Sequence, residues 1–289
     1  MLVETLAVGV CGTDAEIAGG AYGWAPLGRD RLVLGHESLG RVVDLGPSGF
    51  EVGEHVVGVV RRPDPAPCPN CAVGEWDICS NGRYTERGIK QVDGFMAERW
   101  RIEPDYAVRV DKHLGTLGVL LEPATVVAKA WEHVLAIGRR TFWDPRTVLV
   151  VGAGPIGLLA ALIGVQLGAD VHVLDRATSG PKPALVDQLG GTYHTGAISD
   201  LGLSPHIVVE CTGVVELVVQ AMDTVSPGGI VCLTGIGSAS GPGTVSAAAL
   251  ANDVVLKNVA VFGSVNANRR HYYRAATALA KADPSWLEQ

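Results

Sequence analysis

The chain has 289 residues, enough for two domains with sizeable cores. Hydrophobic residues make up 47% and charged residues 18%, an ordinary globular balance, and the net charge of −7 argues against nucleic acid or an anionic membrane as a partner. The first residues carry no basic signal-peptide segment, and no stretch of about 20 residues is apolar throughout. We therefore expect neither a signal peptide nor a membrane span. The spacing of the cysteines favours metal binding in the cytoplasm.

The first part of the chain combines many glycines and prolines with short β-branched runs, such as those at 40–46 and 54–60. This pattern predicts an irregular β-rich domain. Over residues 124–138 the apolar residues recur at helical spacing, which predicts a helix linking this domain to the next.

Strands and helices alternate in the second half of the chain. The apolar run at 147–151 is typical of a strand buried on both faces of a parallel sheet. This alternation predicts the α/β class, with a doubly wound parallel sheet. The expected elements are a turn at 152–157, helices at 158–167 and 215–225, strands at 171–174, 207–210 and 229–233, and a Gly/Ser-rich loop over Gly235–Gly243.

A glycine motif opens the first of these helices. Gly152-Ala153-Gly154-Pro155-Ile156-Gly157 matches G-x-G-x-x-G directly after a buried strand, where the backbone can approach a pyrophosphate at the helix N-terminus. Asp175 ends the second strand and can accept hydrogen bonds from ribose hydroxyls, which favours NAD. Arg176 can stack on adenine or bind a 2′-phosphate, so NADP stays open. The alternative is a glycine turn in a non-binding domain.

Two residues near the start of the chain are candidate ligands of a catalytic zinc. Cys11 lies in Cys11-Gly12-Thr13-Asp14, and His36 lies in Gly35-His36-Glu37. A thiolate, an imidazole and a carboxylate with one open position are what a catalytic zinc needs. The hydroxyl of Thr13 can relay a proton from a bound alcohol, and Asp14 can orient the histidine. Glu37 is either a direct ligand or one held through water. The alternatives are a buried structural cysteine and histidine.

Glu122, in Leu120-Leu121-Glu122-Pro123, is the candidate for a further ligand, placed just before the linking helix. Its alternative is a carboxylate that interacts with the helix dipole. A second cluster, of Cys68, Cys71 and Cys79, favours a structural zinc over three free thiols or a disulfide. Such a site wants four ligands. Pro65 stands where a fourth cysteine is expected, and the neighbouring Asp64 is the nearest substitute.

Together these residues resemble the zinc-dependent medium-chain dehydrogenase/reductase superfamily. Within it the chain is similar to the archaeal-type glucose 1-dehydrogenases, which are also found in bacteria. The closer resemblance rests on Val10–Ile17, Arg61-Arg62-Pro63, Glu86-Arg87-Gly88-Ile89, Asp93-Gly94-Phe95-Met96, Leu121-Glu122-Pro123 and Gly263-Ser264-Val265-Asn266. It implies a GroES-like catalytic domain at 1–134, to which residues 267–289 return, and a Rossmann NAD(P)-binding domain at 135–266. It also implies a fragment truncated at both ends.

The resemblance further implies zinc-dependent oxidation of the C1 hydroxyl of an aldose, such as glucose, galactose or xylose, to the aldonolactone. Cys11, His36 and Glu122 match the catalytic zinc ligands, and Glu37 matches the carboxylate that completes the shell. Thr13, Glu86, Glu122 and Asn266 are placed at the substrate, and Asn266 also at the cofactor. Without the family, Glu86 is a solvated loop charge and Asn266 a turn residue.

Relatives form homodimers or homotetramers, and we expect the same of this chain. Two other functions stay open. One is a related zinc polyol or secondary-alcohol dehydrogenase, and the other is an inactive nucleotide-binding fragment.

Overall fold

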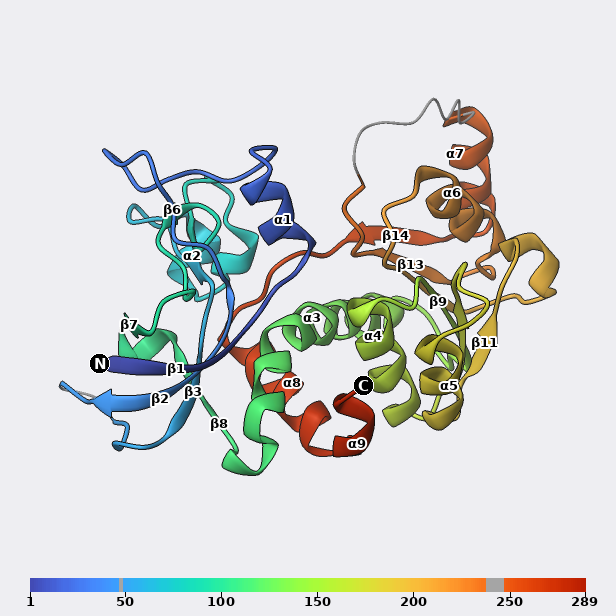
Figure 1. Ribbon diagram of the computed structural model, residues 1–289. Coiled ribbons are helices and arrows are strands. Elements are labelled where there is room, and N and C mark those ends of the chain that lie inside the picture. Colours follow the sequence, from blue (N-terminus) through green and yellow to red (C-terminus); the bar gives the residue numbers. More distant parts are fainter. Residues whose placement is uncertain (47–48, 238–246) are drawn as a thin grey trace. The chain divides into compact units, whose positions relative to one another are not determined.

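The computed structural model describes residues 1–46, 49–237 and 247–289, so residues 238–243 of the predicted Gly/Ser-rich loop lie outside the described residues. The described residues form two compact units (Figure 1). The first contains Met1–Thr125 and Asn266–Pro284, and the second contains Val126–Val265 and Ser285–Gln289. The domain boundary predicted at 134 falls inside a helix that passes from one unit to the other after Thr125, and the last five residues group with the second unit. In the described part of the chain, no helix has the length and apolar character needed to cross a membrane.

The first unit is built on a five-stranded sheet in the order β7-β1-β2-β3-β8. Its strands are β1 Leu2–Gly9, β2 Glu37–Asp44, β3 His55–Gly58, β7 Arg99–Arg101 and β8 Ala107–Val110. The strand predicted at 40–46 begins earlier, at Glu37, because β1 pairs with β2 as far as the Gly9–Glu37 pair. β1 itself was not predicted from the sequence. Val3, Val56, Phe95 and Trp100 belong to the core of this unit.

A smaller sheet completes the β-structure of this unit in the order β4-β5-β6. Its strands are β4 Arg61–Arg62, β5 Thr85–Arg87 and β6 Gln91–Val92. The helical segments here are α1 Gly12–Ala18, α2 Pro69–Ala72, η1 Trp76–Ile78, η2 Pro104–Tyr106, η3 Lys112–Leu120 and α8 Arg269–Ala280. The hydroxyl of the fully buried Tyr272 on α8 accepts a hydrogen bond from the Val60 amide at 3.3 Å. This contact holds a segment from the end of the chain within the first unit.

The second unit is a six-stranded parallel sheet in the order β11-β10-β9-β12-β13-β14. Its strands are β9 Thr147–Val151, β10 Asp170–Leu174, β11 Thr192–His194, β12 Ile207–Glu210, β13 Ile230–Leu233 and β14 Ala260–Gly263. Its helical segments are α4 Pro155–Gln166, α5 Pro181–Gln188, η4 Ile198–Leu201, α6 Val215–Thr224 and α7 Ala247–Leu256. Helix α3 Leu121–Gly138 begins in the first unit and continues into the second. The last helix in the chain is α9 Pro284–Leu287.

Helices cover both faces of this sheet. Leu149 and Val150 are consecutive in β9, so their side chains point to opposite faces. Leu149 clusters with Ala221 of α6, whereas a Cβ added to Gly157 of α4 would lie 3.4 Å from Val150 Cγ1. The α/β class and the doubly wound sheet are thereby confirmed. The strands predicted at 147–151 and 207–210 match their observed bounds.

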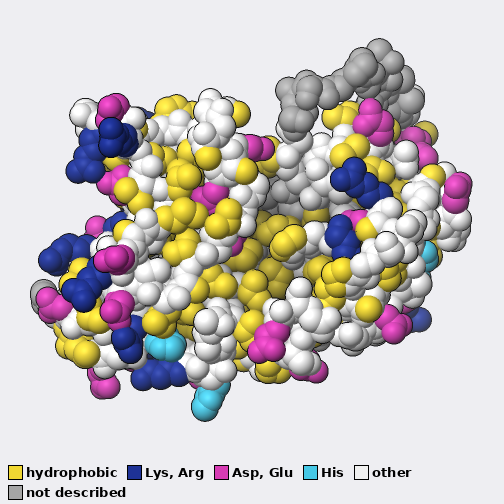
Figure 2. All heavy atoms as spheres, viewed as in Figure 1, with side chains coloured by type: hydrophobic (Ala, Val, Ile, Leu, Met, Phe, Trp, Pro, Cys, Tyr) yellow, Lys and Arg dark blue, Asp and Glu magenta, His cyan; other side chains and the backbone are white. Residues whose placement is uncertain are grey.

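Charged side chains of both signs are mixed on the face shown in Figure 2. Exposed arginines form surface ion pairs, such as Arg29–Asp93 at 2.7 Å and Arg109–Glu54 at 2.8 Å. Such exposed pairs contribute little to stability.

Candidate active site

Cys11 and His36 meet in the first unit. Cys11 is the N-cap of α1, two residues beyond the end of β1, and His36 directly precedes β2. Because β1 and β2 are paired at Gly9 and Glu37, the residues just beyond that pair are brought together. The Cys11 Sγ atom lies 3.1 Å from His36 Nε2, and the imidazole is buried. Strand pairing therefore brings together two potential ligand atoms that are 25 residues apart in sequence.

Asp14 contacts both Cys11 and His36. Its Oδ1 atom lies 3.4 Å from His36 Nδ1 and accepts a hydrogen bond from the Gly35 amide, while its Oδ2 atom accepts one from the Cys11 amide. Burial by itself would lower the pKa of His36, but contact with Asp14 and Cys11 outweighs burial and raises that pKa to about 11. Asp14 thus has the contacts of a residue that orients a histidine ligand.

Two carboxylates lie beside His36. Ligand atoms of His36, Glu37 and Glu122 all lie within 4.8 Å of one another. Glu122 lies inside the first turn of α3, not before the helix as predicted from the sequence, because Pro123 is tolerated in a first turn. Burial, together with the negative charges of Glu37 and Glu86, raises the pKa of Glu122 to about 7 against the opposing effect of His36.

This donor set fits a catalytic zinc. A thiol sulfur, an imidazole nitrogen and carboxylate oxygens converge in two overlapping groups that share His36. The mutual repulsion of buried carboxylates here is the situation that a divalent cation relieves. Thr13 is half-buried in the first turn of α1, two residues from Cys11. Its role as proton relay stays a prediction.

Glu86 and Asn266 also come together in the first unit, although 180 residues separate them in sequence. The side-chain amide of Asn266 donates a hydrogen bond to Glu86 Oε1. The negative charge of Glu86 is among the causes that raise the pKa of the candidate ligand Glu122. The substrate roles of Glu86 and Asn266 and the cofactor role of Asn266 stay predictions.

We expect a Gly9→Ala variant to bind zinc about ten- to hundredfold more weakly, the usual cost of disturbing the surroundings of a metal site. A Cβ on Gly9 would lie 2.0 Å from Glu37 Oε2 and would push that carboxylate away. A Cβ on Gly12 meets nothing within 4 Å, so Gly12→Ala is the control. Zinc titration with a competing chelator measures both variants. Equal affinities would mean that Glu37 does not contribute to the metal shell.

The thiols of Cys68, Cys71 and Cys79 form a second cluster, with sulfur atoms within 4.8 Å of one another. Hydrogen bonds from backbone amides, first that of Cys71, lower the pKa of Cys68 to about 6, whereas burial raises the pKa of Cys71 to about 11. The carboxylate of Asp64 is not in this group, since its oxygens accept hydrogen bonds from Ala66, Asn81 and Arg83. The three thiols fit a structural zinc, with Asp64 at the edge of the cluster.

We expect Cys71→Ser to lose one of two zinc ions per chain and to lower the free energy of unfolding by about 3 kcal/mol, as when a ligand at 100 times its Kd is removed. Cys232→Ala, at a buried cysteine of β13 outside the cluster, is the matched control and keeps both ions. Elemental analysis and thermal unfolding measure the two effects. An unchanged zinc content in the Cys71 variant would leave the cluster as free thiols.

The glycine motif lies between β9 and α4 in the second unit. Gly154 is the N-cap of α4, and Pro155 occupies its first turn. Gly152 has φ +101°, and a Cβ on Gly157 would lie 1.7 Å from the Gly152 carbonyl oxygen. Only glycine fits these two positions, so the turn has the close backbone packing of a dinucleotide-binding site. Pro155 is exposed and Ile156 half-buried.

Asp175 follows β10 beside this turn. Its Oδ2 atom accepts hydrogen bonds from the Ala153 amide at 2.8 Å and from Lys182 Nζ at 2.9 Å, and its Oδ1 atom accepts one from the Ala177 amide. Burial would raise its pKa, but these donors hold it below the usual range. Arg176 is exposed beside it.

Three side chains of interest were not predicted from the sequence. Lys182 contacts Asp175 from the first turn of α5, and no local pattern indicates this. Thr212 follows β12 at the carboxyl edge of the sheet, and its methyl group would lie 2.8 Å from a Cβ on Gly152. The rule that ligands bind at this edge could have found it. Arg61 contacts Glu86 through strand register, which the sequence does not reveal.

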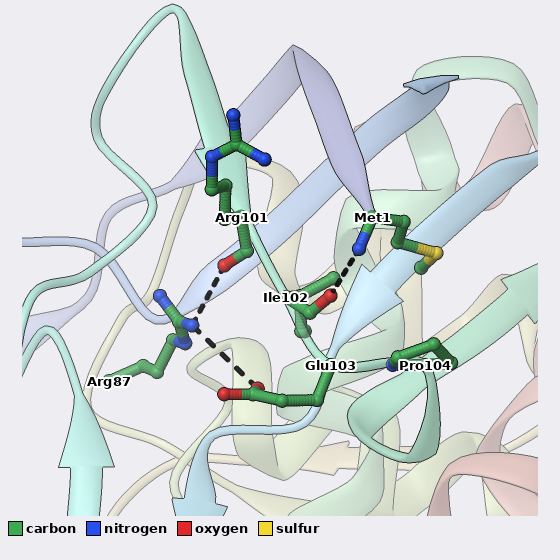
Figure 3. Close-up of a pocket in the computed structure, with 6 residues that line it drawn as sticks. All are labelled: Met1, Arg87, Arg101, Ile102, Glu103 and Pro104. Carbon is green, nitrogen blue, oxygen red and sulfur yellow. Dashed lines mark hydrogen bonds and ion pairs between the residues drawn. The ribbon is translucent and has the colours of Figure 1, made fainter. Parts of the chain in front are cut away.

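A separate pocket on the first unit is lined by Met1, Arg87, Arg101, Ile102, Glu103 and Pro104 (Figure 3). The Arg87 side chain points toward Glu103 and donates to the Arg101 carbonyl at 2.8 Å. None of the predicted site residues lines it.

Two family models match the chain. The alcohol dehydrogenase GroES-like domain matches residues 1–112, and the glucose dehydrogenase C-terminus matches residues 115–289. With the parallel sheet and its glycine turn, these matches define a two-part dehydrogenase of the alcohol dehydrogenase type. The glucose 1-dehydrogenase of Thermoproteus tenax is 40% identical over 99% of this chain and 81% of its own length. The chain belongs to the glucose 1-dehydrogenase family, which confirms the resemblance inferred from the motifs.

Other relatives agree with this placement. The glucose 1-dehydrogenase of Methanocella arvoryzae is 38% identical, over 99% of this chain and 82% of its own length. Among solved structures, Haloferax mediterranei glucose dehydrogenase in complex with NADP, Zn and gluconolactone matches with a TM-score of 0.92 and 34% identity. That match covers 99% of this chain and 83% of the other.

Proposed function

We propose that this chain oxidises the C1 hydroxyl of glucose, or of a similar aldose such as galactose or xylose, to the aldonolactone, with NAD or NADP as hydride acceptor. The observation that carries the proposal is the contact of Cys11 and His36 in the same unit as the Glu86–Asn266 pair. A metal-ligand set next to acceptors for hydroxyl groups is what oxidation of a polyhydroxylated substrate requires. The gluconolactone in the Haloferax complex supports the same reaction.

The residues divide the work. Zinc, held by Cys11 and His36 with Glu37 or Glu122, would polarise the reacting hydroxyl and lower its pKa. Thr13 passes the hydroxyl proton toward solvent. Glu86 and Asn266 hold hydroxyls other than that at C1, and a site built to pair several hydroxyls rejects simple alcohols strongly.

The cofactor would bind at the glycine turn of the second unit, with its pyrophosphate at the N-terminus of α4. Asp175 would accept hydrogen bonds from the adenosine ribose. The adjacent cations Lys182 and Arg176 favour a 2′-phosphate, which supports use of NADP beside NAD. The bound cofactor would supply the nicotinamide as acceptor for the hydride from C1, so the products would be the lactone, the reduced cofactor and one proton.

An activity panel tests this proposal. The purified protein, supplied with zinc, is assayed with NAD and NADP against glucose, galactose, xylose, sorbitol, threonine and ethanol by the absorbance of reduced cofactor. We expect aldoses to be oxidised and ethanol to be rejected. Oxidation of sorbitol, threonine or ethanol without any aldose would favour the related polyol or secondary-alcohol dehydrogenase. Cofactor binding without any oxidation would favour a nucleotide-binding protein.

We also propose a homodimer or homotetramer located in the cytoplasm. β14 is a terminal strand of the second sheet, and an edge strand can pair with a second copy of the chain. All six cysteines are free, as in a reducing compartment. Light scattering of the purified protein measures the oligomeric state.

A further inference from the structure

We infer that Arg61 is a positioning residue for sugar recognition. Arg61 binds one carboxylate oxygen of Glu86 and so fixes the carboxylate in an orientation that leaves its other oxygen for a hydroxyl of the sugar. This inference rests on the proposed function, because it takes Glu86 as a group that binds substrate.

Strand register brings the two side chains together. Arg61 in β4 pairs directly with Glu86 in β5 in an antiparallel register, and directly opposed residues project from the same face of a sheet. Both Nε and Nη2 of Arg61 reach the same atom, Glu86 Oε1, at 3.0 and 2.9 Å. The amide of Asn266 donates to this oxygen as well. Glu86 Oε1 therefore accepts two hydrogen bonds and also makes an ion-pair contact with Arg61 Nη2.

The other oxygen of this carboxylate is free. An arginine and a carboxylate often pair with two parallel hydrogen bonds, which occupies both oxygens. Here all the donors converge on Oε1, and no other described residue donates to Oε2. The Glu86 side chain is 4% exposed. Its Oε2 atom is nevertheless not one of the fully buried polar atoms that lack a hydrogen-bond partner in the described chain, so it stays accessible. A charged acceptor of this kind suits a hydroxyl of a neutral, polyhydroxylated ligand.

Arg61 is itself fixed on its remaining sides. Its Nη1 atom donates to the Asp77 carbonyl at 2.8 Å, and its guanidinium lies over the Tyr84 ring, 3.7 Å from the ring centroid. The side chain is buried, so the guanidinium holds one orientation. A lysine ammonium keeps the charge but cannot span Glu86 and the Asp77 carbonyl in the same planar geometry.

The same segment also holds Asn268. The side-chain amide of Asn268 donates to Asp77 Oδ1 at 2.8 Å and to Glu75 Oε2 at 3.1 Å. Residues around η1 therefore hold Arg61 directly, and they also hold Asn268, which lies two residues along the chain from Asn266. This shared support is expected of parts that must keep a fixed distance from a ligand.

The test compares Arg61→Lys and Arg61→Gln with Arg62→Lys. Arg62 is the matched control, because its guanidinium instead faces Glu103 at 3.3 Å and the Tyr106 ring at 3.8 Å. Values of kcat and KM are measured for the zinc-loaded protein with glucose and with its 2-, 3-, 4- and 6-deoxy analogues. We expect Arg61→Lys to raise KM for glucose about tenfold, with kcat changed by about twofold at most. Arg61→Gln raises KM further, and Arg62→Lys leaves it unchanged.

The deoxy sugars separate positioning from simple structural support. One analogue lacks the hydroxyl that would donate a hydrogen bond to Glu86. For that analogue we expect the Arg61 variants and the unmodified protein to have the same KM. A penalty equal for every sugar, or none at all, overturns the role of Arg61 while glucose oxidation by the unmodified protein stands. If the unmodified protein oxidises no aldose, the proposed function falls and the role of Arg61 falls with it. If Arg61→Gln does not fold, Arg61→Lys carries the same comparison.

Discussion

Replacing His36 by alanine is expected to lower kcat/KM for glucose by about 10³-fold or more, and replacing Cys11 by serine to do nearly the same. The two side chains supply the imidazole nitrogen and the thiol sulfur that face each other at 3.1 Å. Without either one the site loses zinc, and with it several kcal/mol of stabilisation of charge in the transition state, which corresponds to about this factor.

Zinc content and rate are measured together for these variants. His55→Ala is the matched histidine control, since His55 lies in β3 and belongs to neither candidate ligand group. Both site variants should lose the catalytic zinc but keep the ion of the three-cysteine cluster, so one ion per chain remains. Full activity with two ions bound to the His36 variant would rule out this pair as the catalytic ligand set.

Local sequence pattern was sufficient for the four central strands of the second unit, but it did not predict β11, β14, α5 or α7. The run Val148–Val151 is apolar and buried throughout because β9 lies in the middle of a sheet covered on both faces, and such burial is visible within a few residues of sequence. The first unit is harder to predict because its elements are short and irregular. β1, Leu-Val-Glu-Thr-Leu-Ala-Val-Gly, has no strict alternation, and its residues are mostly half-buried. Its strand character comes from pairing with β2 and β7.

The same contrast holds for the candidate site. Cys11, His36 and the glycine turn each lie in a local motif whose chemistry can be read from neighbouring residues. The contact of Arg61 with Glu86 depends on the register of two strands of two and three residues, and Asn266 arrives from 180 positions away. The ionic partner of Asp175, Lys182, depends on where α5 begins. Such contacts are set by tertiary structure, which no local sequence pattern indicates.

Gly154→Ala is expected to weaken cofactor binding by about a hundredfold and to leave the fold intact. Gly154 has φ −79°, a conformation that alanine adopts readily, and a Cβ there meets no protein atom within 4 Å. The loss of stability should therefore stay within about 1 kcal/mol, the usual cost of alanine at an N-cap. If a pyrophosphate occupies the space above this residue, the added methyl group clashes with it at a cost of about 1–3 kcal/mol.

Gly157→Ala separates the two effects, because its clash is with the protein itself. A Cβ there would lie 1.7 Å from the Gly152 carbonyl oxygen, a backbone atom that cannot move without opening the turn. We expect this variant to lose both cofactor binding and about 3 kcal/mol or more of stability. Titration with reduced cofactor, followed by fluorescence, and thermal unfolding measure both variants. If Gly154→Ala binds cofactor as tightly as the unmodified protein, the space above Gly154 is not the pyrophosphate site, and the glycine motif serves only to pack α4 against the sheet.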